Sequence, residues 1–189
     1  MEIAKLAVAA LTPLLVVALG FMVTRAARRI EDAQWANRKV IERRIELYDD
    51  MAPLLNDLFC FFTRVGHYRD VDPPDAVVRK RKLDKLFHTN QHRMGRDFGE
   101  HYMAFMDACF VTYVGPGQDA RLRGWADDHR HERESGKWDA AWDALFVADH
   151  ALATPVSDVK KRYDELMQSF SDFGARHADY DAKGRRQFS

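Results

Sequence analysis

Residues 6–29 read LAVAALTPLLVVALGFMVTRAARR, an apolar run that ends in three arginines. As an α-helix, the 18 residues of Leu6–Val23 would rise about 27 Å, close to the thickness of the hydrocarbon core of a bilayer. Thr12 and Pro13 are the only residues of the run that disfavour a helix, and both are tolerated in membrane-spanning helices. The run therefore predicts a transmembrane anchor over residues 1–24.

A cleaved secretory signal is the alternative interpretation of the same run. Ala18-Leu-Gly20 offers small residues at the spacing that signal peptidase uses. The flank Met1–Lys5, however, has one acid and one base, so it lacks the basic segment that precedes the apolar part of a signal. The run is also longer than a typical signal core, and these features together favour an anchor that is not cleaved.

Basic residues are concentrated after the run. Lys5 alone precedes it, whereas residues 24–44 hold seven Lys or Arg, beginning with Arg25, Arg28 and Arg29. Basic segments stay on the cytoplasmic side of a membrane, so the charges predict an outside amino terminus and a cytoplasmic carboxy-terminal domain. The long side chains of Lys5 and Arg25 can reach the two membrane interfaces.

Residues 25–50 predict a charged helical stalk that continues from the anchor. Half of its 26 residues are charged, it has no Gly or Pro, and opposite charges stand four residues apart, as in Arg28 and Asp32. Its apolar residues recur at intervals of three and four, at Ile30, Ala33, Val40, Ile41 and Tyr48. Trp35 is a large apolar residue on this charged stretch and is a candidate contact for a partner helix.

The rest of the chain predicts an all-α fold, a cytoplasmic bundle of about four to five helices over residues 51–178. Pro53 is expected to break or kink the stalk helix where it enters the core near Met51. Asp72 followed by Pro73 is a typical helix start and predicts a helix from Pro73 to Thr89. No alternating pattern typical of strands is present.

Further elements follow from turn residues and apolar spacing. We expect a helix over Met94–Tyr113, a loop with a short helix over 118–136, an amphipathic helix around Trp138–Phe146, a last helix opened by Thr154-Pro155, and a frayed tail over 179–189.

The sequence offers no motif of a catalytic or cofactor site, so we expect neither an enzyme nor a bound cofactor. His88 and His92 have the spacing of two metal ligands on one helix, but they flank an expected helix end and have no third partner at a fixed spacing. The pair His129 and His131 lies among charges and is interpreted as solvated surface. Cys60 and Cys109 lie in apolar surroundings, which is typical of buried, unreactive thiols.

The strongest basic cluster comprises Arg79, Lys80, Arg81, Lys82 and Lys85. It could neutralise the phosphates of anionic lipids or of a nucleic acid, although a solvated helix face explains it more simply. The chain has 29 basic and 29 acidic residues, and this balance is unlike the basic excess of nucleic-acid-binding proteins.

Five segments resemble a group of uncharacterised bacterial single-pass membrane proteins with a cytoplasmic all-helical domain. They are Val40–Tyr48, Ala52–Asp57, Lys80–Asp84, Cys109-Phe110 and Asp119–Arg123. The resemblance implies a bacterial inner-membrane location and no activity.

Three functions are therefore considered for the chain. The first is a membrane-anchored helical module that binds a protein partner or self-associates through its stalk. The second is a membrane-disrupting effector of a bacterial defence or toxin system, and the third is a hydrolase with a cryptic metal site. The expected partners are the lipid bilayer and a protein or a second copy, rather than nucleic acid.

Overall fold

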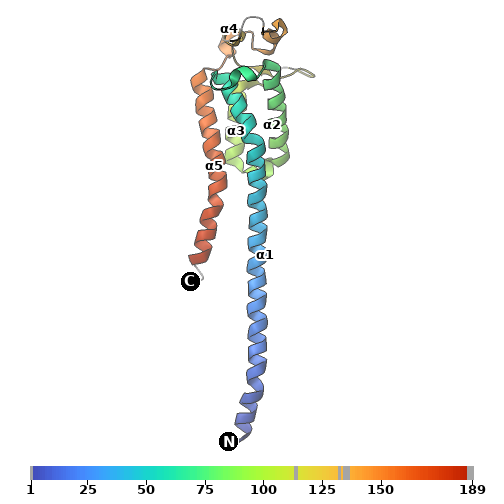
Figure 1. Ribbon diagram of the computed structural model, residues 1–189, viewed down its shortest axis with the longest axis vertical. Helices are drawn as coiled ribbons and strands as arrows, with labels where there is room; N and C mark the ends of the chain where they lie inside the picture. Colours follow the sequence, from blue (N-terminus) through green and yellow to red (C-terminus); the bar gives the residue numbers. More distant parts are fainter. Residues whose placement is uncertain (1, 113–114, 132, 134–136, 187–189) are drawn as a thin grey trace. The chain divides into compact units, whose positions relative to one another are not determined.

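The computed structural model is mostly helical, as the sequence predicts (Figure 1). It describes the backbone of residues 2–112, 115–131, 133 and 137–186, and the side chains of residues 16–17, 19–31, 34–35, 38–112, 115–131, 133 and 137–171. The chain divides into two units, Met1–Arg44 and Ile45–Ser189, which are described separately below. The predicted boundary between stalk and bundle lies a few residues after this division.

The first helix, α1 (Glu2–Thr63), continues through Pro53, where a break or kink was expected. The expectation of a break is wrong because the helix buries a continuous apolar face on both sides of the proline. Met51, Leu55 and Leu58 are all fully buried. Each such side chain stabilises the helix by about 1.5–3 kcal/mol, so together they outweigh the cost of about 3 kcal/mol for an internal proline.

The second helix, α2 (Pro73–Met94), begins at the predicted proline and ends five residues later than predicted. Its amino-terminal residue Asp72 does not cap the helix with its side chain, and the Asp72 carbonyl accepts the first backbone bond from Ala76 at 3.0 Å. At the other end, Met94 is buried and Gly95 supplies the positive φ of 80° that closes the helix. Burial of Met94 therefore stabilises the helical residues beyond Thr89.

The third helix, α3 (Arg96–Cys109), ends earlier than predicted because the chain turns into a strand. The strands β1 (Phe110–Val111) and β2 (Arg121–Leu122) pair antiparallel, with Phe110 opposite Leu122. Phe110 and Leu122 are both fully buried, so the short sheet closes the core at this end. Two-residue strands are too short to show alternation, which is why the sequence predicted helices alone.

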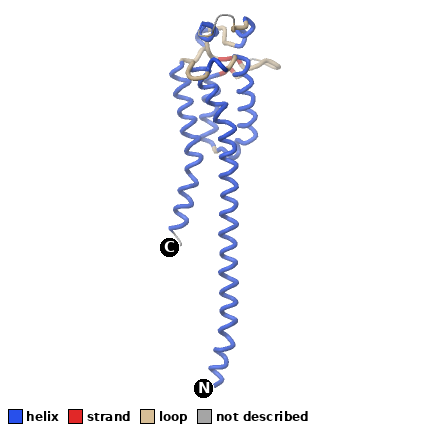
Figure 2. Tube along the Cα trace, viewed as in Figure 1, coloured by secondary structure: helices blue, strands red, loops and turns tan. Residues whose placement is uncertain are grey.

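Short elements fill the remaining connections (Figure 2). They are the 3-10 helices η1 (Tyr68–Asp70), η2 (Ala140–Leu145) and η3 (His150–Leu152), and the helix α4 (Ala126–His131) inside the loop where one was predicted. The amphipathic helix expected around Trp138 is the 3-10 helix η2, which Asp139 caps by accepting from the backbone N–H of Ala141 at 2.9 Å.

The last helix, α5 (Val156–Arg186), begins directly after Thr154-Pro155 as predicted. The backbone of α5 continues to Arg186, beyond residue 179 where a frayed tail was expected, and residues 187–189 lie outside the described residues. Within the unit Ile45–Ser189, α1, α2, α3 and α5 run side by side, and the strands and short elements gather at one end of them (Figure 2). This arrangement is a helical bundle. Residues 121–153, at one end of the bundle, are called the cap.

Aromatic side chains make up much of the bundle core. Phe61, Phe98, Tyr102, Phe105 and Phe110 have at most 2% of their surface exposed. Tyr102 stacks on Phe87 with ring centroids 4.2 Å apart. Aromatic stacking of this kind fills the core of the Ile45–Ser189 unit.

Candidate interaction surface

The predicted anchor lies mostly outside the residues with described side chains. Among the residues that are described, no helix holds an apolar stretch long enough to cross a membrane. Residues 1–15 and 18, including Lys5 and most of the apolar run, are not among them. Arg25, Arg28 and Arg29 are described and exposed on α1. The anchor and its orientation remain predictions from the sequence.

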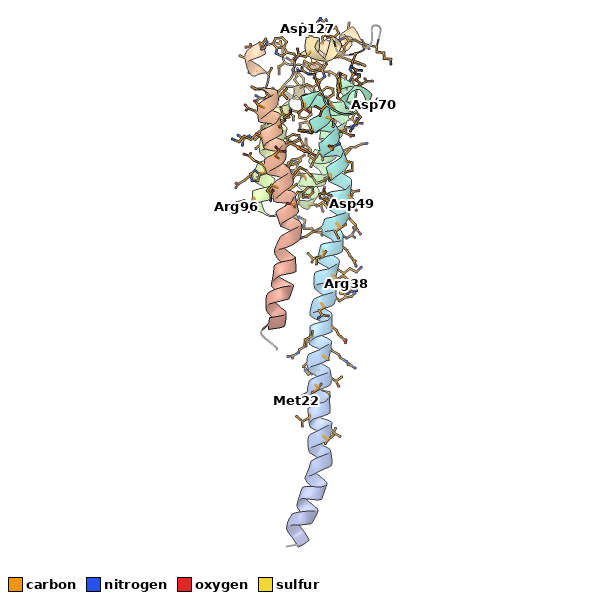
Figure 3. All side chains as sticks on the ribbon, turned by 60° about the vertical axis from the view of Figure 1, so that its left-hand side comes forward. Met22, Arg38, Asp49, Asp70, Arg96 and Asp127 are labelled. Atoms are coloured by element: carbon orange, nitrogen blue, oxygen red, sulfur yellow. The ribbon has the colours of Figure 1, made fainter. Side chains whose placement is uncertain are left out.

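The apolar residues of α1 between Val16 and Ile41 are exposed wherever their side chains are described. The exposed fraction is 67% for Val23, 59% for Ile30 and 37% for Ile41. In Figure 3 the side chains of Met22 and Arg38 stand out from the same helix. The Met1–Arg44 unit is a single helix, so it contains no second element that could cover these apolar residues.

Five of these residues form one face of α1, which we call the stripe: Val16, Leu19, Val23, Ala26 and Ile30. Their spacing alternates between three and four, which is the pattern of positions a and d in a coiled-coil heptad. In the same register Ile41 occupies position e, and the next positions a are Asn37 and Arg44, so the apolar spacing does not continue along the stalk. Trp35, the predicted partner contact, is 64% exposed but projects from the opposite side, at the outer heptad position f, together with Arg28.

The predicted basic cluster does not form one cationic face. Lys80 has only 4% of its surface exposed, and its ammonium donates at 2.5 Å to Asp84, whose side chain is 30% exposed. Arg79 donates to Asp57 at 2.7 Å, and this pair is a main reason why the pKa of the Asp57 carboxyl lies below its usual value despite the opposing effect of burial. Three of the five cluster residues are thus held in ion pairs, the third being the exposed pair of Arg81 with Asp119.

Lys82 and Lys85, the other two residues of the cluster, line a groove between α1 and α2. The groove has a volume of about 600 Å³, and its opposite wall carries Asp49 and Asp50. Within the described residues neither lysine has an ion-pair partner. Because acids face the lysines, the groove has no excess of positive charge, and it is a poor match for a polyanion.

His129, interpreted from the sequence as solvated, is in fact buried with 2% of its surface exposed. Its ring stacks on Phe61 with centroids 4.4 Å apart and planes at 18°, and Phe146 lies against it at 5.3 Å. Burial, followed by the positive charges of Arg64 and Arg133, lowers the pKa of His129 from 6.5 to about 4. The charged neighbours of His129 in sequence hid this burial, since its partners come from other elements.

Arg133 joins the cap to the turn before α2. Its side chain is 5% exposed, and its guanidinium donates to the Asp72 carboxylate at 2.5 Å and to the Val71 carbonyl at 2.6 Å. It also lies over the Trp142 ring, 5.8 Å from the ring centroid. No sequence signal pointed to this residue, because its partners lie about 60 residues earlier in the chain.

Both cysteines are buried free thiols, as the sequence predicts. Burial raises the pKa of the Cys60 thiol and raises that of Cys109 further, so both thiols stay protonated near neutral pH. Within the described residues, no three or more His, Cys, Asp or Glu side chains are grouped so that they could hold a metal ion. His88 and His92 both lie on α2, His92 in its last turn, because the helix ends at Met94 rather than near Thr89 as expected.

No protein-family model, curated protein or solved structure matches this chain. The resemblance to bacterial single-pass membrane proteins stays a prediction. Location and function are therefore argued from the residues and contacts of the chain itself.

Proposed function

We propose that the chain is a non-catalytic, membrane-anchored helical module that binds a protein partner or a second copy of itself through α1. The observation that carries the proposal is the exposure of apolar side chains along the charged stalk, with Ile30 at 59% and Trp35 at 64%. The two side chains lie on opposite faces of α1, so each face of the stalk offers a large apolar contact to a partner.

Two features of the Ile45–Ser189 unit support a binding role for α1. Its basic cluster is mostly neutralised by ion pairs, and its thiols are buried and protonated. Among the described side chains, twelve of the sixteen exposed large apolar residues lie on α1. The anchor proposed from Leu6–Val23 would hold α1 at the bacterial inner membrane, with Arg25, Arg28 and Arg29 on the cytoplasmic side.

Membrane fractionation tests the anchored module. We expect the full chain to remain in the membrane pellet after high-salt and alkaline carbonate washes, and residues 25–189 to be recovered in the supernatant. A reporter fused to the carboxy terminus should be accessible only from the cytoplasm. Release of the full chain by carbonate, or an external carboxy terminus, would contradict the proposal.

A control separates insertion from surface attraction. Exchanging Arg25, Arg28 and Arg29 for Gln removes the basic flank and leaves the apolar run intact. The proposal expects this variant to stay in the carbonate-washed pellet with a mixed orientation, because the flank sets orientation rather than insertion. Loss of the variant from the pellet would show that attraction to anionic lipid alone had retained the chain.

A further inference from the structure

We infer that the groove between α1 and α2 binds an amphipathic helix of a protein partner, with basic residues along one edge of its apolar ridge and acidic residues along the other. The groove lies on the Ile45–Ser189 unit, away from the stalk and the predicted anchor. The inference therefore goes beyond the proposed function and does not depend on it.

Each wall of the groove carries one sign of charge. The α1 wall has the carboxylates of Asp49 and Asp50, and the α2 wall has the ammonium groups of Lys82 and Lys85. All four residues are exposed, so their charges are available to an occupant. Within the part of the chain that the structure describes, none of these four side chains forms an ion pair. The two walls therefore do not neutralise each other across the groove.

Apolar residues line the groove between its charged walls. Leu54 and Leu86 are half-buried and pack against the core, and Pro53 lines the groove beside them. The lining residues of α2 lie at positions 82, 85, 86, 89 and 90, which is one helix face that rises about 12 Å. A groove of this length between two helices accommodates about two turns of a third helix, with its apolar ridge on the two leucines.

The charges of the two walls define the chemistry of the occupant. A polyanion would be repelled by Asp49 and Asp50, and a polycation would be repelled by Lys82 and Lys85. A helix with Lys or Arg on the edge facing α1 and Asp or Glu on the edge facing α2 meets opposite charge on both walls.

Two further features of the groove favour a helix with a basic edge over a small molecule. Pro53 has no backbone N–H, so it does not donate the usual helical bond to the Asp49 carbonyl, and the α1 wall gains an acceptor. The groove is also open to solvent rather than enclosed, whereas sites for small molecules bury most of the ligand.

Three synthetic helical peptides with the same leucine ridge test the inference. One has Arg on one edge and Glu on the other, the second has Arg on both edges, and the third has Glu on both. Each is titrated by fluorescence anisotropy against the full chain in nanodiscs of zwitterionic lipid, with empty nanodiscs as the blank. We expect the mixed peptide to bind about ten-fold more tightly than either single-sign peptide, and the difference to shrink at high salt.

Charge reversal of one wall locates the binding. The variant Lys82→Glu with Lys85→Glu makes both walls acidic, so it should bind the mixed peptide about ten-fold more weakly and prefer the peptide with Arg on both edges. The matched control Lys160→Glu with Lys161→Glu changes two exposed lysines of α5 that do not line this groove, and it should bind as the unchanged chain does. Circular dichroism checks that the variants are folded.

Exchange of the charges between the two walls gives a second test. Adding Asp49→Lys and Asp50→Lys to the two lysine substitutions restores opposite walls, and the mixed peptide should regain its affinity by binding in the reverse direction. Equal affinities of the three peptides, equal losses in the groove and control variants, or no binding of any peptide would overturn the inference. Membrane fractionation of the full chain would be unaffected by these results, so the anchored module is tested separately.

Discussion

The imidazole of His129 stacks on the ring of Phe61, with centroids 4.4 Å apart and planes inclined by 18°. The contact joins α4 in the cap to the end of α1 in the bundle. It is flanked by an ion pair between Arg64 and Asp128, which joins the same two regions. A charge on His129 would therefore be buried among aromatic rings, and close to two arginines.

The free energy of unfolding should fall at acid pH because His129 becomes protonated. The folded state lowers the pKa of this group from 6.5 to about 4, so the unfolded chain takes up a proton at higher pH than the folded chain does. The stabilising effect is complete above pH 6.5 and is lost as the pH falls toward 4. Between pH 7 and pH 5 the loss amounts to about 2 kcal/mol. Urea unfolding at the two pH values measures it.

The matched control for this prediction is the exposed His131. The variant His129→Gln should lose most of the difference between pH 7 and pH 5, whereas His131→Gln should keep it. An unchanged difference in His129→Gln would assign the acid sensitivity to other groups.

Arg133 should matter more for stability than the neighbouring Arg130. Arg133→Lys cannot donate to the Asp72 carboxylate and the Val71 carbonyl in the same geometry, so we expect a loss of about 2 kcal/mol in the free energy of unfolding. Arg130 pairs with Asp143 at the surface, and Arg130→Lys should cost less than about 1 kcal/mol. Equal losses in chemical unfolding would show that burial of Arg133 is not what holds the cap.

The ion pair between the buried Lys80 and the partly exposed Asp84 should respond more to a single substitution than to a double one. Asp84→Asn leaves the Lys80 ammonium without its charged partner, and we expect a loss of about 3 kcal/mol. The double variant Lys80→Met with Asp84→Leu should recover at least half of that loss, even though Tyr102 then loses the acceptor of its hydroxyl. Thermal and urea unfolding of both variants give the comparison. A loss in the double variant as large as that in Asp84→Asn would contradict the role given to this ion pair.

Both thiols should be slow to react in the folded chain. Burial raises the pKa of Cys60 and Cys109, so little thiolate is present at pH 8. We expect a disulfide reagent such as DTNB to modify two thiols quickly in denaturant, and the same two at least a hundred-fold more slowly without it. Fast modification of the folded chain would show that at least one cysteine is accessible.

The sequence predicted helices and their starts better than it predicted the positions of single polar residues. Pro73 and Thr154-Pro155 mark helix starts through local backbone chemistry, and both starts are confirmed. The continuation of α1 through Pro53 depends on tertiary packing, which local pattern does not contain. Lys80 lies inside a basic run and is buried only because Asp84 and the Phe110 ring surround it.

The candidate surface was predictable in part. Apolar spacing on the stalk and the exposed Trp35 could be predicted from the sequence, because a helix periodicity is local. The assignment of Trp35 to the face opposite Ile30 follows once α1 is seen to be one regular helix. His129 and Arg133 could not be found this way, since their main contacts, with Phe61 and with Asp72 and Val71, come from residues more than 60 positions earlier.

The molar mass of the full chain in detergent, compared with that of residues 25–189, tests most directly whether the stalk of α1 is an interaction surface. Light scattering coupled to size exclusion gives both masses, after subtraction of bound detergent. Self-association through the stalk predicts an oligomer for each, with Ile30→Asp shifting both toward monomers. A monomer of residues 25–189 under conditions where the full chain is a dimer, or monomers of both, would contradict it.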